Sequence, residues 1–245
     1  MSRRKERPDH LEIGMDVVRT PETIYDTDDG GKGQHRPMHG YVCYIHPRGL
    51  FHTVYKDIRR PGADKLLAWL ESTDFFTAPA GAKHHGAHAG GLVVHSLNVW
   101  NRLREITLRD TINGKAILDL APETNETVAI LALLHDVCKV GVYHTETKRR
   151  RNPDTGTWED YQAYTFRDPS PLGHGEKSLY LITKYMALTE EEALAIRWHM
   201  GAFDDAVKGG SRALDAAMDV SPWVWRLHEA DMCAARIDER KVAGV

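Results

Sequence analysis

Residues 126–140 read ETVAILALLHDVCKV, and this stretch indicates the fold more clearly than any other part of the chain. It is apolar nearly all round from Val128 to Leu134, which predicts a helix at the centre of a helical domain. His135 and Asp136 follow directly on this helix. A buried carboxylate costs several kcal/mol unless it is paired, hydrogen-bonded or bound to a metal, so Asp136 is expected to have partners elsewhere in the fold.

Further amphipathic helices are predicted on both sides of this stretch, and the expected fold class is therefore mainly α. Thr189 and Glu192 form a capping box at the start of one helix. Ser221 followed by Pro222 has the residue types that favour the N-cap and first position of another. The helical segments are DKLLAWLES from Asp64 onward, 92–105, 126–140, 174–187, 190–200 and about 222–239.

Two segments with the composition of β-strands interrupt the helical pattern. Residues 41–56, YVCYIHPRGLFHTVYK, are rich in strand-forming residues around a central Pro-Arg-Gly, which predicts a small hairpin. Within 143–172, the polar turn KRRRNPDTG precedes the strand-like WEDYQAYTF, which predicts a hairpin insertion. We expect a loop up to residue 40, an N-terminal arm with a hairpin over 1–60, and a helical domain over 61–245 with the insertion at about 143–172.

The composition narrows the class of protein. The chain has 245 residues with a net charge of -3, and this near-neutral balance argues against a general nucleic-acid coat. No apolar run approaches the roughly 20 residues of a membrane helix, and the start, MSRRKERPDHLEIG, lacks the apolar core of a secretory signal. Cys43, Cys138 and Cys233 are odd in number and far apart, so we expect reduced thiols and a cytoplasmic protein.

Ionisable residues fall on helix faces that should be apolar. His95, for example, shares a face with Leu92 and Val99. A single histidine in such a place is more often a core residue with one hydrogen bond, but imidazoles and carboxylates together are the ligand set of Zn, Mn, Fe or Co. Six such groups on five helices can converge in one bundle core. The six are His95, His135, Asp136, His174, His199 and Asp231.

A family resemblance follows from the order of these motifs. The strings HHGAHAGGLVVHS, LLHDVCK, GHGEKS, IRWHM and HEADMCAARID, spread over about residues 64–240, resemble the HD-domain superfamily of metal-dependent phosphohydrolases. The first string is similar to the branch that includes bacterial 3′-5′ exoribonucleases with an HD domain. The N-terminal region shows no convincing OB-fold domain of the kind those enzymes carry, which argues against a nuclease.

The resemblance implies roles for the six residues. His95, His135, Asp136 and Asp231 would hold a first divalent metal ion. His174 and His199 would hold a second ion with Asp136 as the bridge, or would contact the substrate or transfer protons in a one-metal site; we expect two ions. The ion can be Mn, Fe, Co, Ni, Zn or Mg.

The resemblance also implies a reaction. Divalent ions lower the pKa of bound water and neutralise phosphoryl charge, so a hydroxide can attack a phosphate ester. The expected substrate is a nucleotide or another small phosphorylated metabolite. The alternatives are a 3′-5′ exonuclease or cyclic-nucleotide phosphodiesterase, a di-iron oxygenase, and a non-catalytic nucleotide-binding module.

Basic residues and histidines near the motifs are candidates for contacting the substrate. Lys139 lies one turn beyond His135 and is expected to be catalytic together with Asp136. The other candidates are His84, His85 and His88 in a glycine-rich loop, together with Lys177 and Arg197 on helices.

The predicted hairpin carries a basic run over 148–151, and its second strand carries Trp158, Tyr161 and Tyr164, which could stack on bases. A solvated hairpin tip is the more usual reading of such a charge run, so nucleic acid is not the favoured partner. No membrane partner is expected, and the oligomeric state stays open.

Overall fold

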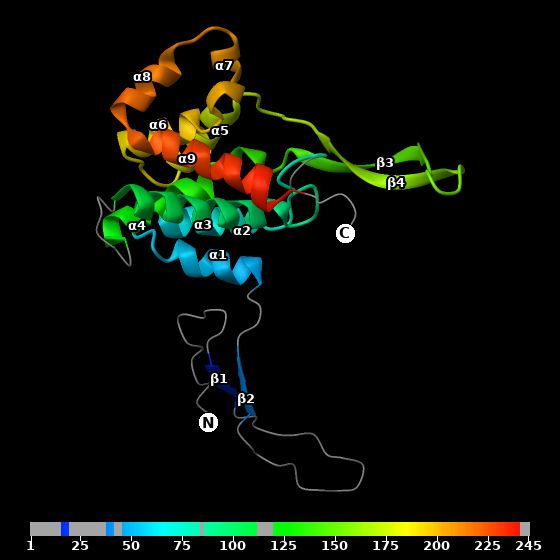
Figure 1. Cartoon of the computed structure of the whole chain (residues 1–245), viewed down its shortest axis with the longest axis horizontal. Coiled ribbons are helices and arrows are strands. Elements are labelled where there is room, and N and C mark those ends of the chain that lie inside the picture. Colours follow the sequence, from blue (N-terminus) through cyan, green and yellow to red (C-terminus); the bar gives the residue numbers. More distant parts are fainter. Residues whose placement is uncertain (1–15, 20–37, 42–45, 84–85, 112–119, 241–245) are drawn as a thin grey trace, which may run out of the picture. The chain divides into compact units, whose positions relative to one another are not determined.

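The computed structural model describes residues 16–19, 38–41, 46–83, 86–111 and 120–240 (Figure 1). The chain divides into two compact units, 1–53 and 54–245. In the first unit, β1 (Asp16–Arg19) and β2 (Met38–Tyr41) pair antiparallel, with Asp16 opposite Tyr41. The helix α1 (Pro47–Tyr55) spans the division between the units.

The N-terminal predictions were partly wrong. The hairpin expected over 41–56 is replaced from Pro47 onward by α1, and two short strands lie in the segment expected to be loop. Proline has no backbone N–H and a helix-like φ, so it favours the first position of a helix rather than a hairpin turn. Phe51, Val54 and Tyr55 then recur at the i, i+3, i+4 spacing of a helix face.

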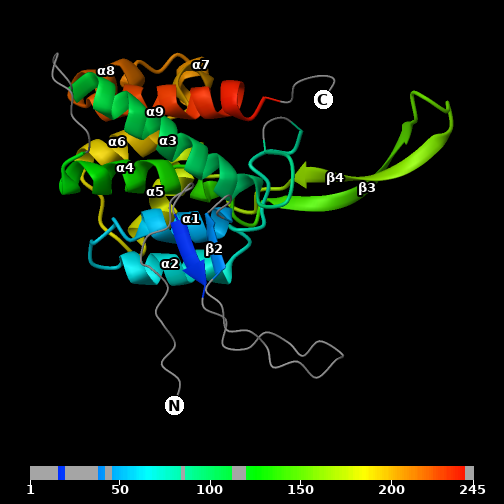
Figure 2. The ribbon, with the colours of Figure 1, turned by 60° about the horizontal axis from the view of Figure 1, so that its bottom comes forward.

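The second unit is a helical bundle, seen from a second direction in Figure 2. In this bundle α3 packs against α4 and α9, while α6 packs against α5, α8 and α9. The longer helices are α2 (Ala63–Ser72), α3 (Gly91–Thr111), α4 (Pro122–Leu134), α5 (His174–Thr183), α6 (Glu190–Trp198), α8 (Ala213–Val220) and α9 (Pro222–Cys233). Shorter turns of helix are η1 (Val137–Lys139), η2 (Gly201–Phe203), α7 (Asp205–Lys208) and the π-helical η3 (Ala234–Asp238).

The central helix is α4, as predicted. Every residue from Val128 to Leu134 is fully buried. The helix is shorter than expected, because the chain leaves helical geometry at Asp136 (φ -106°, ψ 16°) and continues as η1. The mainly helical fold is therefore confirmed, and the core lies directly beside the His-Asp pair.

The predicted caps are present and explain where two helices begin. Thr189 accepts a hydrogen bond from the Glu192 backbone N–H, and the Glu192 side chain accepts one from the Thr189 N–H. Ser221 accepts from the Trp223 N–H, with Pro222 at the first helical position. These caps satisfy backbone donors that a helix start otherwise leaves open.

The predicted hairpin insertion is also present. The strands β3 (Tyr143–Arg151) and β4 (Trp158–Phe166) pair antiparallel, with Tyr143 opposite Phe166 at the base and Arg151 opposite Trp158 near the tip. The hairpin projects away from the helices in both views (Figures 1 and 2). In the described part of the chain, no helix is both long and apolar enough to span a membrane.

Candidate metal centre

The six histidines and aspartates predicted to act together lie on five elements of the bundle. His95 is on α3 and Asp231 on α9, whereas His135 and Asp136 follow the last residue of α4. His174 is the first residue of α5, and His199 caps the end of α6. The sequence therefore places most of these side chains at helix ends, where they point into the space between packed helices.

Asp136 lies between two pairs of histidines. Its Oδ2 is 3.5 Å from the Nε2 atoms of His95 and His135. Its Oδ1 is 2.8 Å from Nε2 of His174 and 3.7 Å from Nε2 of His199. Each carboxylate oxygen thus faces one pair of imidazoles, which is the arrangement that a bridging carboxylate needs.

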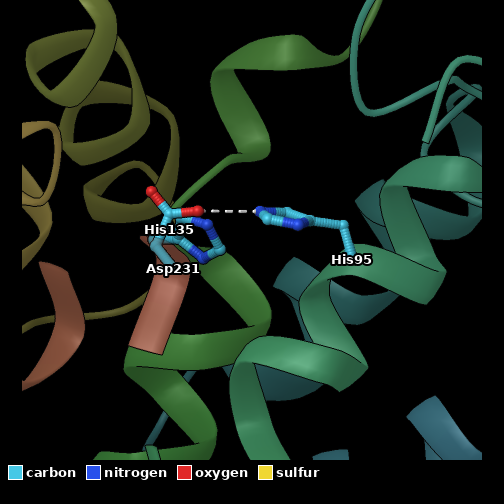
Figure 3. A group of neighbouring side chains, drawn as sticks. All are labelled: His95, His135 and Asp231. Carbon is cyan, nitrogen blue, oxygen red and sulfur yellow. Dashed lines mark ion pairs between the residues drawn. The ribbon is translucent and has the colours of Figure 1, made fainter. Parts of the chain in front are cut away.

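Asp231 is a second carboxylate in contact with the first of these groups. Its Oδ1 is 3.1 Å from Nε2 of His95, and Figure 3 shows the His95 ring extending from α3 toward that carboxylate with His135 beside it. His95, His135 and Asp231 each offer one ligand atom within 4.8 Å of the others. His135, Asp136 and His199 form a second group by the same measure.

The histidine tautomers fit a metal. Nδ1 of His135 lies 2.9 Å from the Ala132 carbonyl, and Nδ1 of His199 lies 2.7 Å from the Ile196 carbonyl. A carbonyl only accepts, so Nδ1 carries the hydrogen and the lone pair of a neutral ring is on Nε2. Both Nε2 atoms are buried without a hydrogen-bond partner among the described residues. Buried acceptors of this kind, aimed at one carboxylate, suit divalent metal ions.

The pKa shifts differ from residue to residue in this cluster. Burial lowers the pKa of His199 below its ordinary value, which favours the neutral, ligating ring. Burial alone would raise the pKa of Asp136, but the Lys139 ammonium beside it holds this pKa well below its usual range, so the carboxylate stays ionised. Burial would also lower the pKa of Lys139, yet the Asp136 carboxylate raises it above the ordinary value. Lys139 therefore stays a cation.

Lys139 and the metal centre open onto one cavity. Lys139 Nζ is 2.6 Å from Asp136 Oδ2, and both side chains line a cavity of about 430 Å³. His174 and Asp231 line the same cavity. This volume lies within the range of small-molecule sites in proteins.

Three of the other predicted substrate contacts, His88, Lys177 and Arg197, are not among the described residues that line this cavity. His84 and His85 lie outside the described residues. His88 is exposed, and its Nδ1 is 3.0 Å from the Ala89 carbonyl. Lys177 and Arg197 have partners on the chain and are not among the described residues that line the cavity.

Those partners give Lys177 and Arg197 structural roles. Lys177 is buried and its Nζ is 2.6 Å from Asp168 Oδ1. The Arg197 guanidinium pairs with Glu176 at 2.5 Å and Asp204 at 2.8 Å, and lies 3.9 Å from the centre of the Trp198 ring. Each of the two cations thus has a carboxylate partner.

Sequence reasoning missed Glu239, Tyr143 and Arg236. Glu239 Oε1 is 2.9 Å from His95 Nδ1, so this carboxylate orients a predicted ligand. Tyr143, at the base of the hairpin, and Arg236, on η3, both line the cavity. The π turn accounts for two of these omissions: the Glu239 N–H bonds to the Ala234 carbonyl at 3.0 Å, an i to i+5 bond that α-helical periodicity does not anticipate.

Two of the four cations in the basic run on the hairpin pair with carboxylates of the opposite strand. Arg149 pairs with Asp160 at 3.2 Å and Arg150 with Glu159 at 2.6 Å across the two strands. Arg150 also lies 5.0 Å from the centre of the Tyr161 ring. Arg149 and Arg150 are therefore paired within the hairpin.

Comparison with protein families agrees with this geometry. A family model described as HD domain matches residues 92–238, more than half of the chain. The chain belongs to the HD-domain family, whose members are typically metal-dependent phosphohydrolases. Searches of the curated proteins and of the solved structures found no match. The likeness to the exoribonuclease branch therefore stays a prediction.

Proposed function

We propose that this chain hydrolyses the phosphate ester or anhydride of a small metabolite, with a nucleotide as the favoured substrate. The observation that carries the proposal is the position of Asp136. Each of its oxygens faces a separate pair of histidines, and the carboxylate lines a cavity together with a permanent cation, Lys139. This is the donor set and the charge pattern that two-metal phosphoryl transfer requires.

The ligands divide into two groups around the bridge. His95, His135 and Asp231 would hold one ion with Oδ2 of Asp136, and His174 and His199 would hold the other with Oδ1. When bound, such ions activate water and neutralise phosphoryl charge. The chain's own part is to fix the donors: carbonyls and Glu239 hold the far nitrogen of three of these rings, which keeps each Nε2 directed inward.

Cations at the cavity suit a phosphoryl group. Lys139 is placed to bind phosphoryl oxygens or to give a proton to the leaving oxygen, because it is held protonated beside Asp136. Arg236 adds a second cation whose forked donors match phosphate oxygens. Tyr143 offers a hydroxyl on the same wall.

The rest of the cavity suits the non-phosphate part of a nucleotide. Met200, Phe203 and Met232 form apolar walls beside the charged residues. Thioether and aromatic side chains accommodate planar rings. A cavity of about 430 Å³ also has the size of a single small ligand rather than of a polymer track.

The test is a phosphate-release screen on protein whose metal content has been measured. The panel contains nucleoside mono-, di- and triphosphates, cyclic mono- and dinucleotides, short RNA and simple sugar phosphates. We expect metal-dependent turnover of a nucleotide or another small phosphate, abolished by a chelator and restored by added metal. Turnover of RNA in preference to the small compounds would favour the exonuclease.

Two further results would overturn the proposal. Metal-loaded protein that consumes oxygen and releases no phosphate would favour the di-iron oxygenase. Metal-loaded protein that binds a nucleotide tightly without hydrolysing any member of the panel would favour the binding module.

A further inference from the structure

We infer that the Cys138 thiolate is a ligand of the second metal position, beside His174, and that this position selects a thiophilic ion such as Zn, Co or Fe over Mg. The inference rests on the proposed metal centre and goes beyond it, because neither the His-Asp motifs nor the family membership assigns this cysteine a role. It identifies the class of cofactor that this chain takes.

Cys138 lies inside the cluster rather than beside it. The residue is on η1, two positions after Asp136, and is nearly fully buried. Its Sγ is 3.5 Å from Nδ1 and 3.7 Å from Nε2 of His174. Asp136, Cys138 and His174 each offer one ligand atom within 4.8 Å of the others.

The three groups are close enough to reach one ion. With ordinary Zn–N and Zn–S bond lengths and tetrahedral angles, a nitrogen and a sulfur on the same zinc lie about 3.6 Å apart. The 3.7 Å between Cys138 Sγ and His174 Nε2 is close to that spacing, while the 3.5 Å between Sγ and Nδ1 means that the His174 ring turns when Nε2 and the thiolate share an ion. His174 Nε2 is in turn 2.8 Å from Asp136 Oδ1.

An independent observation points to an ion at the same place. His199 Nε2 is fully buried, has no hydrogen-bond partner among the described residues, and lies 3.7 Å from the Asp136 oxygen that His174 contacts. The His174 and His199 rings are 5.1 Å apart between centroids. The lone pair of this nitrogen has no hydrogen-bond partner among the described residues. An ion bound between the nitrogen and the Asp136 oxygen would satisfy it.

The local fold keeps the thiol in position. The Cys138 N–H donates to Ser178 Oγ at 3.2 Å, and Ser178 is a fully buried residue of α5, one turn after His174. This bond ties η1 to the start of α5. The bond therefore holds the backbone of Cys138 close to the helix that begins with His174.

The chemistry of the thiol then determines the ion. A cysteine binds metal as the thiolate, so the S–H bond breaks, a metal–sulfur bond forms and the proton leaves to solvent. Thiolates prefer Zn, Co and Fe, whereas Mg prefers oxygen ligands and retains water. A second position made of carboxylate, two imidazoles and a thiolate is poorly suited to Mg.

The experiment uses Co(II) as a spectroscopic probe in the full-length chain. Wild type is compared with Cys138→Ser and with a matched control, Cys233→Ser, which replaces a free cysteine that is not in the cluster. We expect a thiolate-to-cobalt charge-transfer band in wild type and in the control, and none in Cys138→Ser. The loss of one ligand should weaken the second ion at least about 10-fold and leave the first ion bound.

A second measurement does not depend on how Cys138→Ser folds. The double variant Cys43→Ser, Cys233→Ser leaves Cys138 as the sole cysteine of the sequence. X-ray absorption of the Zn-loaded double variant should show a sulfur neighbour at about 2.3 Å. Competition should leave Zn bound in a large excess of Mg.

The outcomes separate this inference from the proposed function. Two bound ions with no sulfur neighbour and no charge-transfer band would overturn the role of Cys138 and leave the hydrolase proposal standing. A sulfur-ligated ion in protein that releases no phosphate would support Cys138 and count against hydrolysis. Wild-type protein that binds no divalent ion would overturn both.

Discussion

Asp136 is the residue on which the site depends, because each of its two oxygens faces a different set of side chains. Oδ2 faces His95, His135 and Lys139, while Oδ1 faces His174 and His199. No other described carboxylate contacts both groups. Its ionised state is maintained by neighbouring positive charge despite its burial, which holds its pKa well below the ordinary range.

Replacing this carboxylate should remove the metal while leaving the fold in place. Asp136→Asn keeps the side-chain volume but loses the charge and one oxygen donor. We expect metal affinity and turnover to fall by more than about 100-fold, beyond the loss typical of a residue that only supports a ligand. Mass spectrometry measures the metal content, phosphate release measures the turnover, and circular dichroism measures whether the fold is retained.

Asp160→Asn is the matched control, because this aspartate is exposed on the hairpin and pairs only with Arg149 among the described contacts. It should leave metal content and turnover unchanged. Full metal content and full turnover in Asp136→Asn would contradict the central role of this residue.

Glu239 supports a ligand from outside the cluster. Its Oε1 is 2.9 Å from His95 Nδ1 and accepts from Asn98 Nδ2 at 3.0 Å. Glu239→Gln should lower metal affinity about 10- to 100-fold, because the neutral amide weakens the orientation and basicity of the His95 ring. A titration against a competing chelator measures the affinity.

The neighbouring Asp238→Asn provides the comparison for Glu239→Gln. Asp238 pairs with Arg102 rather than with the histidine. An equal loss of affinity in both variants would mean that the effect comes from the helix end rather than from the His95 contact.

His95 should make the metal-free protein pH-dependent. Burial alone would lower the pKa of His95, but hydrogen bonds to the Asp231 and Glu239 carboxylates outweigh it and raise the pKa to about 9. An unfolded histidine has a pKa of about 6.5. The stability from this group is therefore fully present below about pH 6.5 and lost as the pH rises through about 9.

Melting curves of chelator-treated protein from pH 6 to about 10 test whether stability falls as the pH rises. We expect Tm to fall across that window in wild type and to fall less in His95→Gln. Because a metal requires the neutral ring, metal affinity should rise over the same window. A Tm that rises with pH in wild type relative to His95→Gln would contradict the assigned protonation.

At the scale of elements, the site is built from helix ends around one buried helix. α4 supplies the His-Asp pair at its C-terminus, α5 begins with His174, and α6 ends at His199. The π turn after α9 brings in Arg236 and Glu239. The helix that is followed by the His-Asp pair is thus also the buried central helix of the core.

Leu133→Ala tests how much the burial of this helix contributes to stability. Leu133 is fully buried on α4, two residues before His135. The truncation should leave a cavity and lower the free energy of unfolding by about 2–5 kcal/mol. Urea denaturation of metal-free protein measures the loss.

Leu172→Ala is the control, because Leu172 is 48% exposed in the loop before α5. It should change the stability by less than about 0.5 kcal/mol. A similar cost in both variants would contradict the central position of α4 in the core.

At the scale of the whole molecule, the helical unit carries the site and the hairpin extends from it. Tyr143 at the hairpin base lines the cavity, whereas the tip carries exposed Trp158 and cross-strand ion pairs. An isolated two-stranded hairpin is at best marginally stable in water. The outer part therefore contributes little to the stability of the bundle.

Removing the outer hairpin tests whether the site is complete without it. Residues 148–161 are replaced by Asn-Gly, a two-residue turn that joins Thr147 to its strand partner Gln162. We expect Tm to shift by only a few degrees and kcat/KM for a small phosphate substrate to stay within about threefold.

Tyr143→Phe in the full chain is the comparison for the shortened hairpin. This change removes a hydroxyl from the cavity wall and should lower kcat/KM more than the loss of the tip does. A larger loss in the shortened chain would show that the hairpin tip takes part in the reaction.

The sequence alone determined the helical class, the central helix, the caps at Thr189 and Ser221, and the hairpin insertion. These features depend on local periodicity and on backbone donors that neighbouring residues satisfy. Local patterns also misled: strand-like composition over 41–56 concealed α1, in which Pro47 begins a helix. The six ligand candidates were recognisable because polar groups on apolar faces need partners.

Only the tertiary structure decided which of these groups meet, and through which atoms. It places each Asp136 oxygen before a different histidine pair, and brings Cys138 to His174 across 36 positions of sequence. It also pairs Lys177 and Arg197 within the bundle instead of at the cavity. Spacing along a helix fixes the face of a side chain, but helix packing and the π turn after α9 set the distances between faces, and those distances bring the ligand candidates together.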